Sequence, residues 1–381
     1  MNANKILRRF FAAALTAALL SVHTIPSFAD SAGAESTASE EVNIIMVGDM
    51  LMHMRVVNSG KQEDGSYDFS GLFDHVRDRV ASADIALVNQ ETILGGPELG
   101  GYTGFPAFNS PYEVGDAEAG AGFDVILQGT NHALDKGAKG IENCLSFWEE
   151  SHPEIPVLGI HDSAEDQKEL CILEVKGIRF AILNYTYGTN GIQMPKGKGY
   201  LVDYLSKEQV AADIERAEKE ADFTILCPHW GTEYSTGISA YQKDWAKLFL
   251  EKGVDLVIGT HPHVIEPIEY LTDEAGHEML VYYSLGNFVN STSGSGKGVM
   301  NRFVGGMADV TVKMEDGRAR IVRYTIHPTI GHLGGKKDIT AYFLSDYTEE
   351  LSKVNQARER DASFSLENCR KLVEKIWPDH E

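Results

Sequence analysis

Short apolar runs alternate with longer amphipathic segments from Val42 to about Asp255. Several runs are four or five residues long and rich in β-branched side chains, a pattern that predicts strands buried on both faces. The expected strands are Asn43–Val47, Ile85–Val88, Val125–Gln128, Phe180–Asn184, Phe223–Cys227, Leu256–Gly259, Leu280–Ser284, Phe303–Lys313 and Ala319–His327. The expected helices are Leu72–Ser82, Ala138–Glu150, Ser206–Glu220 and Ala240–Glu251, with a capping box at Ser206 and Gln209. The alternation predicts an α/β fold, and the hairpin-like strands after Met279 predict that its sheets are mixed.

The N-terminus has the three parts of a secretory signal peptide. Three basic residues precede an uncharged apolar run, Phe10–Leu20, and Ser27-Phe28-Ala29 offers a cleavage site. An uncleaved membrane anchor is the alternative, but the run is shorter than the ~20 apolar residues that a spanning helix needs. We therefore expect a signal peptide over 1–29, a linker over 30–41, a main domain over 42–330 and a helical C-terminal extension over 331–381. The mature protein is expected outside the cytoplasm, secreted or at the cell surface.

Charge narrows the possible partners. The formal net charge is −22, and residues 1–29 carry three basic and no acidic side chains, so the cleaved chain would stand at −25. Such a surface repels nucleic acid, and we expect no nucleic-acid partner. It also repels an anionic substrate unless the binding site holds cations, which divalent metal ions could supply. The four cysteines allow three disulfide connectivities that the sequence leaves open, although Cys171 and Cys227 lie in strand-like runs that favour buried thiols.

Polar clusters follow most of the predicted strands. They are Gly48-Asp49 with His53 four residues on, Asn89-Gln90-Glu91-Thr92, Asn131-His132-x-x-Asp135, His229-Trp230-Gly231-x-Glu233, Gly259-Thr260-His261-Pro262-His263 and Ser284-Leu285-Gly286-Asn287-Phe288. Taken singly, each has a structural reading as a turn or cap. Together they predict convergence, because ligands bind outside the carboxyl ends of strands in α/β sheets. In an extended segment, His261 and His263 would point to the same side. The set of Asp, Glu, Asn and His side chains suits Mn, Fe or Zn.

The order of these motifs resembles the CapA-type poly-γ-glutamate capsule biosynthesis family, a branch of the calcineurin-like metallophosphoesterases. The resemblance runs from Val47 to about Val289 and is most specific at His229–Tyr234 and Gly259–His263. It implies two packed mixed β-sheets flanked by helices, with two divalent metal ions at the strand ends. It also implies an anionic polymer or a phosphorylated small molecule as substrate, and membrane proteins of capsule synthesis as partners.

The resemblance assigns roles residue by residue. The implied metal ligands are Asp49, Glu91, Asn131, His229, His261 and His263, with Glu91 bridging the two ions. His132 resembles the general acid that protonates a leaving oxygen, and Asp135 would orient its ring. His53, Glu233 and Asn287 would contact substrate or support the ligands.

The resulting hypothesis is a metal-dependent hydrolase in capsule or cell-envelope synthesis. One alternative is a non-catalytic scaffold for export or anchoring of a polyanion. It is favoured by Leu51, because the wider superfamily carries a histidine two positions after the first aspartate. The other alternative is an exported nucleotidase or phosphodiesterase, with Trp230, Tyr234 and Tyr187 as candidates for stacking on a base.

Overall fold

The computed structural model describes residues 40–292 and 294–378, which lie in the compact unit Ser39–Glu381. The predicted signal peptide and residues 30–39 of the predicted linker lie outside the described residues. Glu41, the last residue of that predicted linker, already begins strand β1. In the described part of the chain, no helix is long and apolar enough to cross a membrane.

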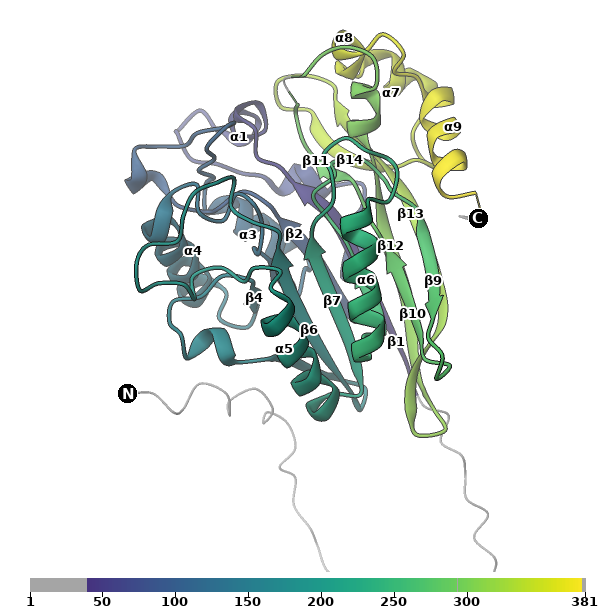
Figure 1. The fold of residues 1–381 in the computed structure, drawn as a ribbon. Helices are drawn as coiled ribbons and strands as arrows, with labels where there is room; N and C mark the ends of the chain where they lie inside the picture. Colours follow the sequence, from purple (N-terminus) through teal and green to yellow (C-terminus); the bar gives the residue numbers. More distant parts are fainter. Residues whose placement is uncertain (1–39, 293, 379–381) are drawn as a thin grey trace, which may run out of the picture. The chain divides into compact units, whose positions relative to one another are not determined.

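Two mixed sheets form the framework (Figure 1). The first has the order β14-β13-β12-β1-β2-β3-β4, with β11 also paired to β1. Strands β1, β2, β3 and β4 run parallel, whereas β12, β13 and β14 are joined by antiparallel pairing. Its strands are β1 (Glu41–Met50), β2 (Ile85–Gln90), β3 (Val125–Leu127), β4 (Val157–Leu158), β11 (Asn287–Val289), β12 (Val304–Glu315), β13 (Arg318–Leu333) and β14 (Ile339–Phe343).

The second sheet has the order β5-β6-β7-β8-β10-β9. Its four central strands are parallel, and the two edge strands pair antiparallel to their neighbours. The strands are β5 (Cys171–Val175), β6 (Ile178–Thr186), β7 (Phe223–His229), β8 (Leu256–Ile258), β9 (Ile268–Thr272) and β10 (Glu278–Tyr282). The prediction of an α/β fold with two mixed sheets flanked by helices is confirmed.

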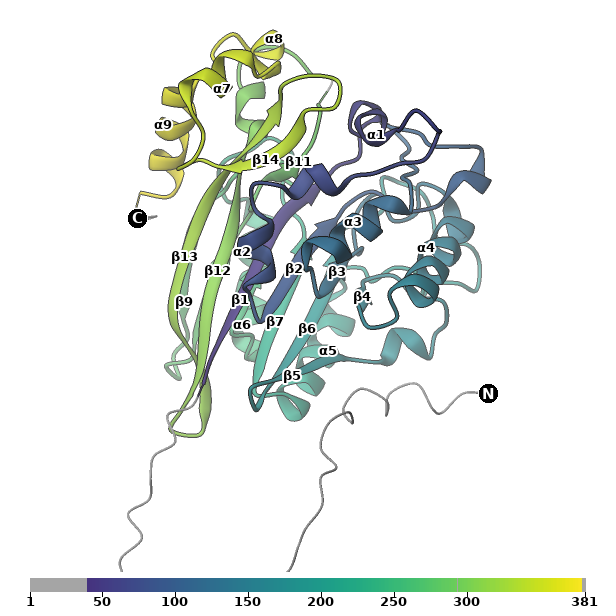
Figure 2. The ribbon, with the colours of Figure 1, turned by 180° about the vertical axis from the view of Figure 1, so that it is seen from behind.

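Helices cover the outer faces of the sheets (Figures 1 and 2). The pair α5 and α6 lies against the second sheet, and α2, α3 and α4 lie beside the first. The helices are α1 (Met54–Gly60), α2 (Arg77–Ala81), α3 (Glu113–Ala121), α4 (Gly137–Ser151), α5 (Lys207–Glu220), α6 (Ala240–Lys252), α7 (Glu349–Val354), α8 (Ala357–Arg360) and α9 (Leu366–Ile376). Short 3-10 turns are η1 (Ser70–Phe73), η2 (Pro97–Leu99), η3 (Asp166–Lys168) and η4 (Val299–Phe303).

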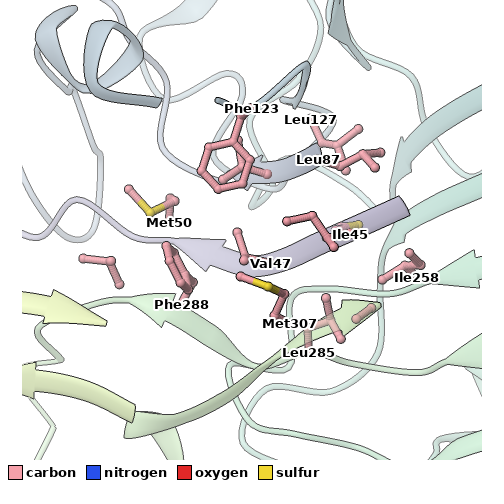
Figure 3. Packing of buried hydrophobic residues seen from close by; sticks show 14 of the residues in the cluster. Ile45, Val47, Met50, Leu87, Phe123, Leu127, Ile258, Leu285, Phe288 and Met307 are labelled. Atoms are coloured by element: carbon pink, nitrogen blue, oxygen red, sulfur yellow. The ribbon is translucent and has the colours of Figure 1, made fainter. Parts of the chain in front are cut away.

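The alternation of side chains in the second sheet explains its uninterrupted apolar runs. In β6, Phe180 and Ile182 belong to the large core shared with the first sheet, whereas Ala181 and Leu183 belong to the smaller core that includes residues of α5 and α6. Because successive side chains of a strand point to opposite faces, a strand between two cores must be apolar at every position. Part of the large core, around Val47, is drawn in Figure 3.

Three local predictions were wrong. The helix expected at Leu72–Ser82 is instead η1 followed by a turn and the short helix α2, an arrangement that still buries Leu72, Val76 and Val80. The capping box forms at Ser239 with Gln242, before α6, and not at Ser206, whose hydroxyl contacts the Glu208 carboxylate.

The third wrong prediction concerns the C-terminal extension over 331–381, which was expected to be helical. It first forms β14, which pairs with β13 and buries Ile339 and Ala341. Five alternating residues are too short a signal to outweigh the helical pattern that follows, and only the free edge of β13 makes them a strand. The predicted domain boundary at 330/331 falls within β13.

Candidate metal centre

The carboxyl ends of strands from both sheets meet at one place. Asp49 lies near the end of β1, where it is paired with Asn89 of β2 and with Asn287 of β11. His229 ends β7 in the other sheet and is bridged to Thr260, which follows β8. The polar clusters are therefore gathered because parallel strands in two packed sheets end side by side.

Glu91 lies at the centre of this cluster. It follows β2, its side chain is fully buried, and neither carboxylate oxygen has a hydrogen-bond donor in residues 40–292 or 294–378. Its Oε1 lies 3.6 Å from Nε2 of His263, 3.7 Å from Nε2 of His229 and 4.0 Å from Nε2 of His132. Burial raises the pKa of Glu91 well above its usual value. A buried carboxylate without partners is costly, so this position calls for a cation.

Three imidazoles surround that carboxylate. The ring centroids of His229 and His261 are 4.8 Å apart, and those of His261 and His263 are 5.7 Å apart. His229 is held between the Thr260 hydroxyl, 3.0 Å from Nδ1, and the Asn131 side-chain oxygen, 2.9 Å from Nε2. Burial, followed by the neighbouring histidines, lowers the pKa of both His229 and His261 well below the usual value. Both are therefore neutral at pH 7, which is the form of imidazole that binds a metal.

His263, on the other side of the cluster, is held by contacts of its Nδ1 with two side chains. Its Nδ1 lies 3.0 Å from Oδ2 of Asp49 and 3.1 Å from Oδ1 of Asn287, which leaves Nε2 facing Glu91. Burial alone would lower the pKa of His263, but the carboxylates of Glu91 and Asp49 outweigh it and raise the pKa to about 9. The other oxygen of Asp49 accepts hydrogen bonds from the Asn89 amide and, more weakly, from the backbone N–H of His261. Asp49 thus also positions the histidines.

The segment that carries these two histidines is not extended. The backbone φ angle is +97° at His261 and +59° at His263, and residues other than glycine rarely adopt such values. The alternation argument for a shared side was therefore wrong, although the two rings do lie together. Strained backbone of this kind persists only where the surrounding structure holds it, and it gathers at functional sites.

His132 stands beside the cluster, with its Nδ1 engaged by a carboxylate. Oδ2 of Asp135 lies 2.7 Å from its Nδ1 and also accepts a hydrogen bond from the backbone N–H of Phe108. The Phe108 ring packs edge-on against the imidazole, at 4.7 Å between centroids. With Nδ1 engaged by the carboxylate, Nε2 of His132 is the nitrogen that faces Glu91.

A cavity opens beside the cluster. Among the residues predicted as site residues, it is lined by His53, His132, Glu233, His263 and Asn287. Nδ1 of His53 lies 3.3 Å from the Leu51 carbonyl and 3.4 Å from the backbone nitrogen of Ser291. Glu233 is exposed at this cavity, and Asn287 is buried between His263 and Arg302.

The donor set fits a divalent cation. Glu91, His261 and His263 each offer a ligand atom, and these atoms lie within 4.8 Å of one another. Within residues 40–292 and 294–378, the oxygens of Glu91 and Nδ1 of His261 have no hydrogen-bond partner, and an ion would satisfy both groups. Carboxylate and imidazole ligands suit Mn, Fe or Zn.

Comparison with known proteins places the chain. Residues 43–292 match the family model described as bacterial capsule synthesis protein PGA_cap. The chain belongs to this family. It is 27% identical over 259 residues to the capsule biosynthesis protein CapA of Bacillus anthracis, covering 66% of this chain and 60% of that protein. It is 30% identical over 174 residues to the PGA biosynthesis protein CapA of Bacillus subtilis strain 168, covering 44% and 42%. The chain thus spans less than two thirds of the length of these relatives.

Solved structures with some likeness include nucleotidases and phosphoesterases. The NAD nucleotidase NadN of Haemophilus influenzae has a TM-score of 0.47 at 14% identity, covering 90% of this chain and 60% of that one. The calcineurin-like phosphoesterase YfkN of Bacillus subtilis has a TM-score of 0.44 at 13% identity, covering 87% and 99%.

Some residues of the site escaped the sequence reasoning. Asn89 and Thr260 stand inside recognised motifs, and their position next to a metal-type residue could have indicated a supporting role. Arg302 lies beyond the last motif, on η4, and reaches the cavity only through folding of the chain after β11. Trp230, considered for base stacking, is fully buried and donates its indole N–H to the Tyr283 carbonyl.

Proposed function

We propose that this protein is an exported, divalent-metal-dependent hydrolase that acts on a phosphoester or polymer substrate in capsule synthesis. The observation that carries the proposal is Glu91, a fully buried carboxylate with no hydrogen-bond donor in the described part of the chain and with three imidazoles facing its Oε1. A divalent cation would satisfy both of its oxygens and the lone pairs of the neutral imidazoles of His229 and His261.

Six side chains would hold the ions: Asp49, Glu91, Asn131, His229, His261 and His263. Two ions are proposed because the family resemblance implies a pair, and these donors come from strand ends of both sheets. When bound, such ions lower the pKa of a coordinated water and stabilise negative charge on the reacting group.

The chain itself would supply the proton. Asp135 fixes the His132 ring through Nδ1, so that Nε2 points toward the cluster and can donate a proton to the leaving oxygen. Phe108 supports this arrangement twice, by its backbone N–H on Asp135 and by its ring against the imidazole. A general acid in this position contributes about 100- to 10,000-fold to the rate.

The names of the relatives suggest the substrate. Both relatives are CapA proteins, one described in capsule biosynthesis and the other in PGA biosynthesis. We propose an anionic polymer such as poly-γ-glutamate, or a phosphorylated small molecule, as substrate, with membrane proteins of capsule synthesis as partners. Action outside the cytoplasm follows from the proposed signal peptide.

A scaffold without catalysis is the second candidate, favoured by one observation. Leu51 lines the cavity where the superfamily pattern has a histidine, and both oxygens of Asp49 are already engaged by hydrogen bonds. Fewer ligands would then be available to the first ion.

Metal analysis of the purified protein, followed by a panel of phosphoester and γ-glutamyl substrates, tests both candidates. Two ions per chain with hydrolysis of one substrate class supports the hydrolase. Bound metal without turnover on any substrate, or protein that takes up no metal when Mn, Fe and Zn are supplied, favours the scaffold.

A further inference from the structure

Arg302 is a positively charged residue that lines the cavity and belongs to none of the sequence motifs. It is the one lysine or arginine among the described residues that line the cavity, and it lies beyond the family-matched segment 43–292. Glu233 lines the same cavity, Asp49 and Glu91 lie beside it, and the whole chain carries a net charge of −22. An anionic substrate entering here meets repulsion from these carboxylates, and Arg302 is the permanent charge that can oppose it.

Neighbouring side chains orient the Arg302 guanidinium, but not all of its N–H groups have a hydrogen-bond acceptor in the described residues. It stacks 3.5 Å above the centroid of the Tyr234 ring, and Nη1 donates to the Thr292 hydroxyl over 3.1 Å. Its Nε is buried, with no acceptor in the part of the chain that the structure describes. No carboxylate pairs with it there. A planar guanidinium is the group that best binds carboxylate or phosphate through two parallel hydrogen bonds.

The backbone of Arg302 is tied to the proposed metal ligands. Its carbonyl accepts hydrogen bonds from the side-chain amides of Asn287 and Asn290, at 2.9 and 2.5 Å. Asn287 also donates to the backbone carbonyl of His263 and contacts its Nδ1. The Tyr234 ring beneath the guanidinium lies 6.0 Å from the His263 ring. Arg302 and His263 are therefore held in a fixed relation by a single asparagine.

The C-terminal helices hold the turn that carries Arg302. Oδ2 of Asp361, the residue after α8, accepts hydrogen bonds from the backbone N–H of Gly298 and Met300, at 2.8 and 3.1 Å. The Arg360 carbonyl accepts another from Gly296. Helix α8 lies at the same end of the fold as β11 in both views (Figures 1 and 2). The segment after β14 therefore holds the backbone turn that carries Arg302.

We propose that Arg302 binds an anionic group of the substrate, carboxylate or phosphate, beside the metal centre, and that Asp361 is a positioning residue for it. The proposal rests on the proposed function, since it names what recognises the substrate of that same site. Carboxylate and phosphate share the chemistry that a guanidinium recognises, and the two sources are separated by the probes used below.

Direct binding is the first test. Inorganic phosphate and tri-γ-glutamate are titrated by calorimetry into the full-length protein, with and without added Mn²⁺, for wild type and for Arg302→Gln. We expect Arg302→Gln to weaken one of the two probes at least tenfold while metal content and Tm stay unchanged. The preferred probe identifies the anion. Arg320→Gln, an exposed arginine on β13, is the matched control and should bind like wild type.

Two further variants separate recognition from folding. Arg302→Lys keeps the charge but loses the planar pair of donors, and should fall between wild type and Arg302→Gln. Asp361→Asn weakens the hold on Gly298 and Met300, and should reduce binding by a few-fold with metal content intact. If any substrate is hydrolysed, Arg302→Gln should raise KM far more than it lowers kcat.

The failures are distinguishable. Wild-type affinity for both probes in Arg302→Gln overturns the anion-binding role, whatever the metal analysis shows. Wild-type protein that binds no metal but loses anion binding in Arg302→Gln overturns the hydrolase and keeps the role of Arg302. Asp361→Asn with unchanged affinity removes Asp361 from the proposal.

Discussion

Nε2 of His229 lies 3.7 Å from Oε1 of Glu91, and these two groups come from different sheets. The distance is too long for a hydrogen bond and short enough for both atoms to bind one ion. Within the described residues, the Glu91 carboxylate accepts no hydrogen bond, and burial keeps His229 neutral. Through this pair, each of the two sheets contributes a side chain to the same candidate site.

Glu91→Gln should separate metal binding from folding. We expect metal affinity to fall at least 10- to 100-fold, the range seen even for residues that only support a ligand. The free energy of unfolding of the metal-free protein should stay within about 1 kcal/mol of wild type or rise, because an amide replaces an unpartnered buried carboxylate. Thermal unfolding with and without Mn²⁺ measures both. A variant that keeps the metal-induced rise in Tm would contradict the role of Glu91.

His261→Gly should lose metal yet gain stability over His261→Ala. Both variants remove the imidazole, so metal content and hydrolysis fall together. Glycine adopts φ +97° without the strain that a Cβ imposes, so the metal-free glycine variant should be more stable by about 1 kcal/mol. Denaturant unfolding and metal analysis are the readouts. His152→Ala, which removes a partly buried histidine paired with Asp116, should keep the metal.

His132→Ala should keep the metal ions and lose turnover. The expected loss in kcat is about 100- to 10,000-fold, the contribution of a positioned general acid. Asp135→Asn should lower kcat less, because the ring stays in place while its preferred tautomer is lost. Loss of metal in His132→Ala would instead make this residue a ligand.

His161 should give the protein a pH-dependent stability away from the metal centre. Its Nε2 lies 2.6 Å from Asp203 and its Nδ1 lies 3.1 Å from Asp166. Burial lowers its pKa, but these two carboxylates outweigh burial and raise the pKa to about 9. Because the folded pKa lies above the unfolded value of 6.5, the stabilisation is complete below pH 6.5 and disappears as pH rises to about 9.

The size of that effect can be bounded. A shift of this extent corresponds to about 3 kcal/mol, and exposure of the Asp166 side chain screens part of it, so we expect about 1–2 kcal/mol. Urea unfolding of wild type and His161→Gln, with a chelator at pH 6 and pH 9, measures the difference. Equal pH dependence of the two proteins would show that His161 contributes nothing.

The mature protein should begin near Asp30. The basic residues, the short apolar run and the Ser27-Phe28-Ala29 site predict cleavage there. N-terminal sequencing of protein recovered outside the cytoplasm should return Asp30. Recovery of Met1 on material held at the membrane would instead indicate an anchor.

Local pattern was enough for nine of the strands and for the polar clusters at their ends, but it missed β4, β5, β9, β11 and β14. The runs at β1, β2, β6 and β7 are apolar at nearly every position because each lies between two layers, and this signal needs no tertiary context. The mixed sheets and the family follow from the same residues, and both predictions are confirmed. The residues proposed as ligands were named from their motifs, and their roles stay predictions.

The amino-acid sequence by itself determined that polar, metal-binding types of residue follow the apolar strands. Only the tertiary structure decided how they meet. The left-handed backbone at His261 and His263 depends on contacts with Asp49 and Asn287 from other strands, so no local periodicity could indicate it. Arg302 reaches the cavity because the C-terminal helices fasten its turn through Asp361. Contacts between residues far apart in the chain leave no local pattern, because they arise only when the sheets pack.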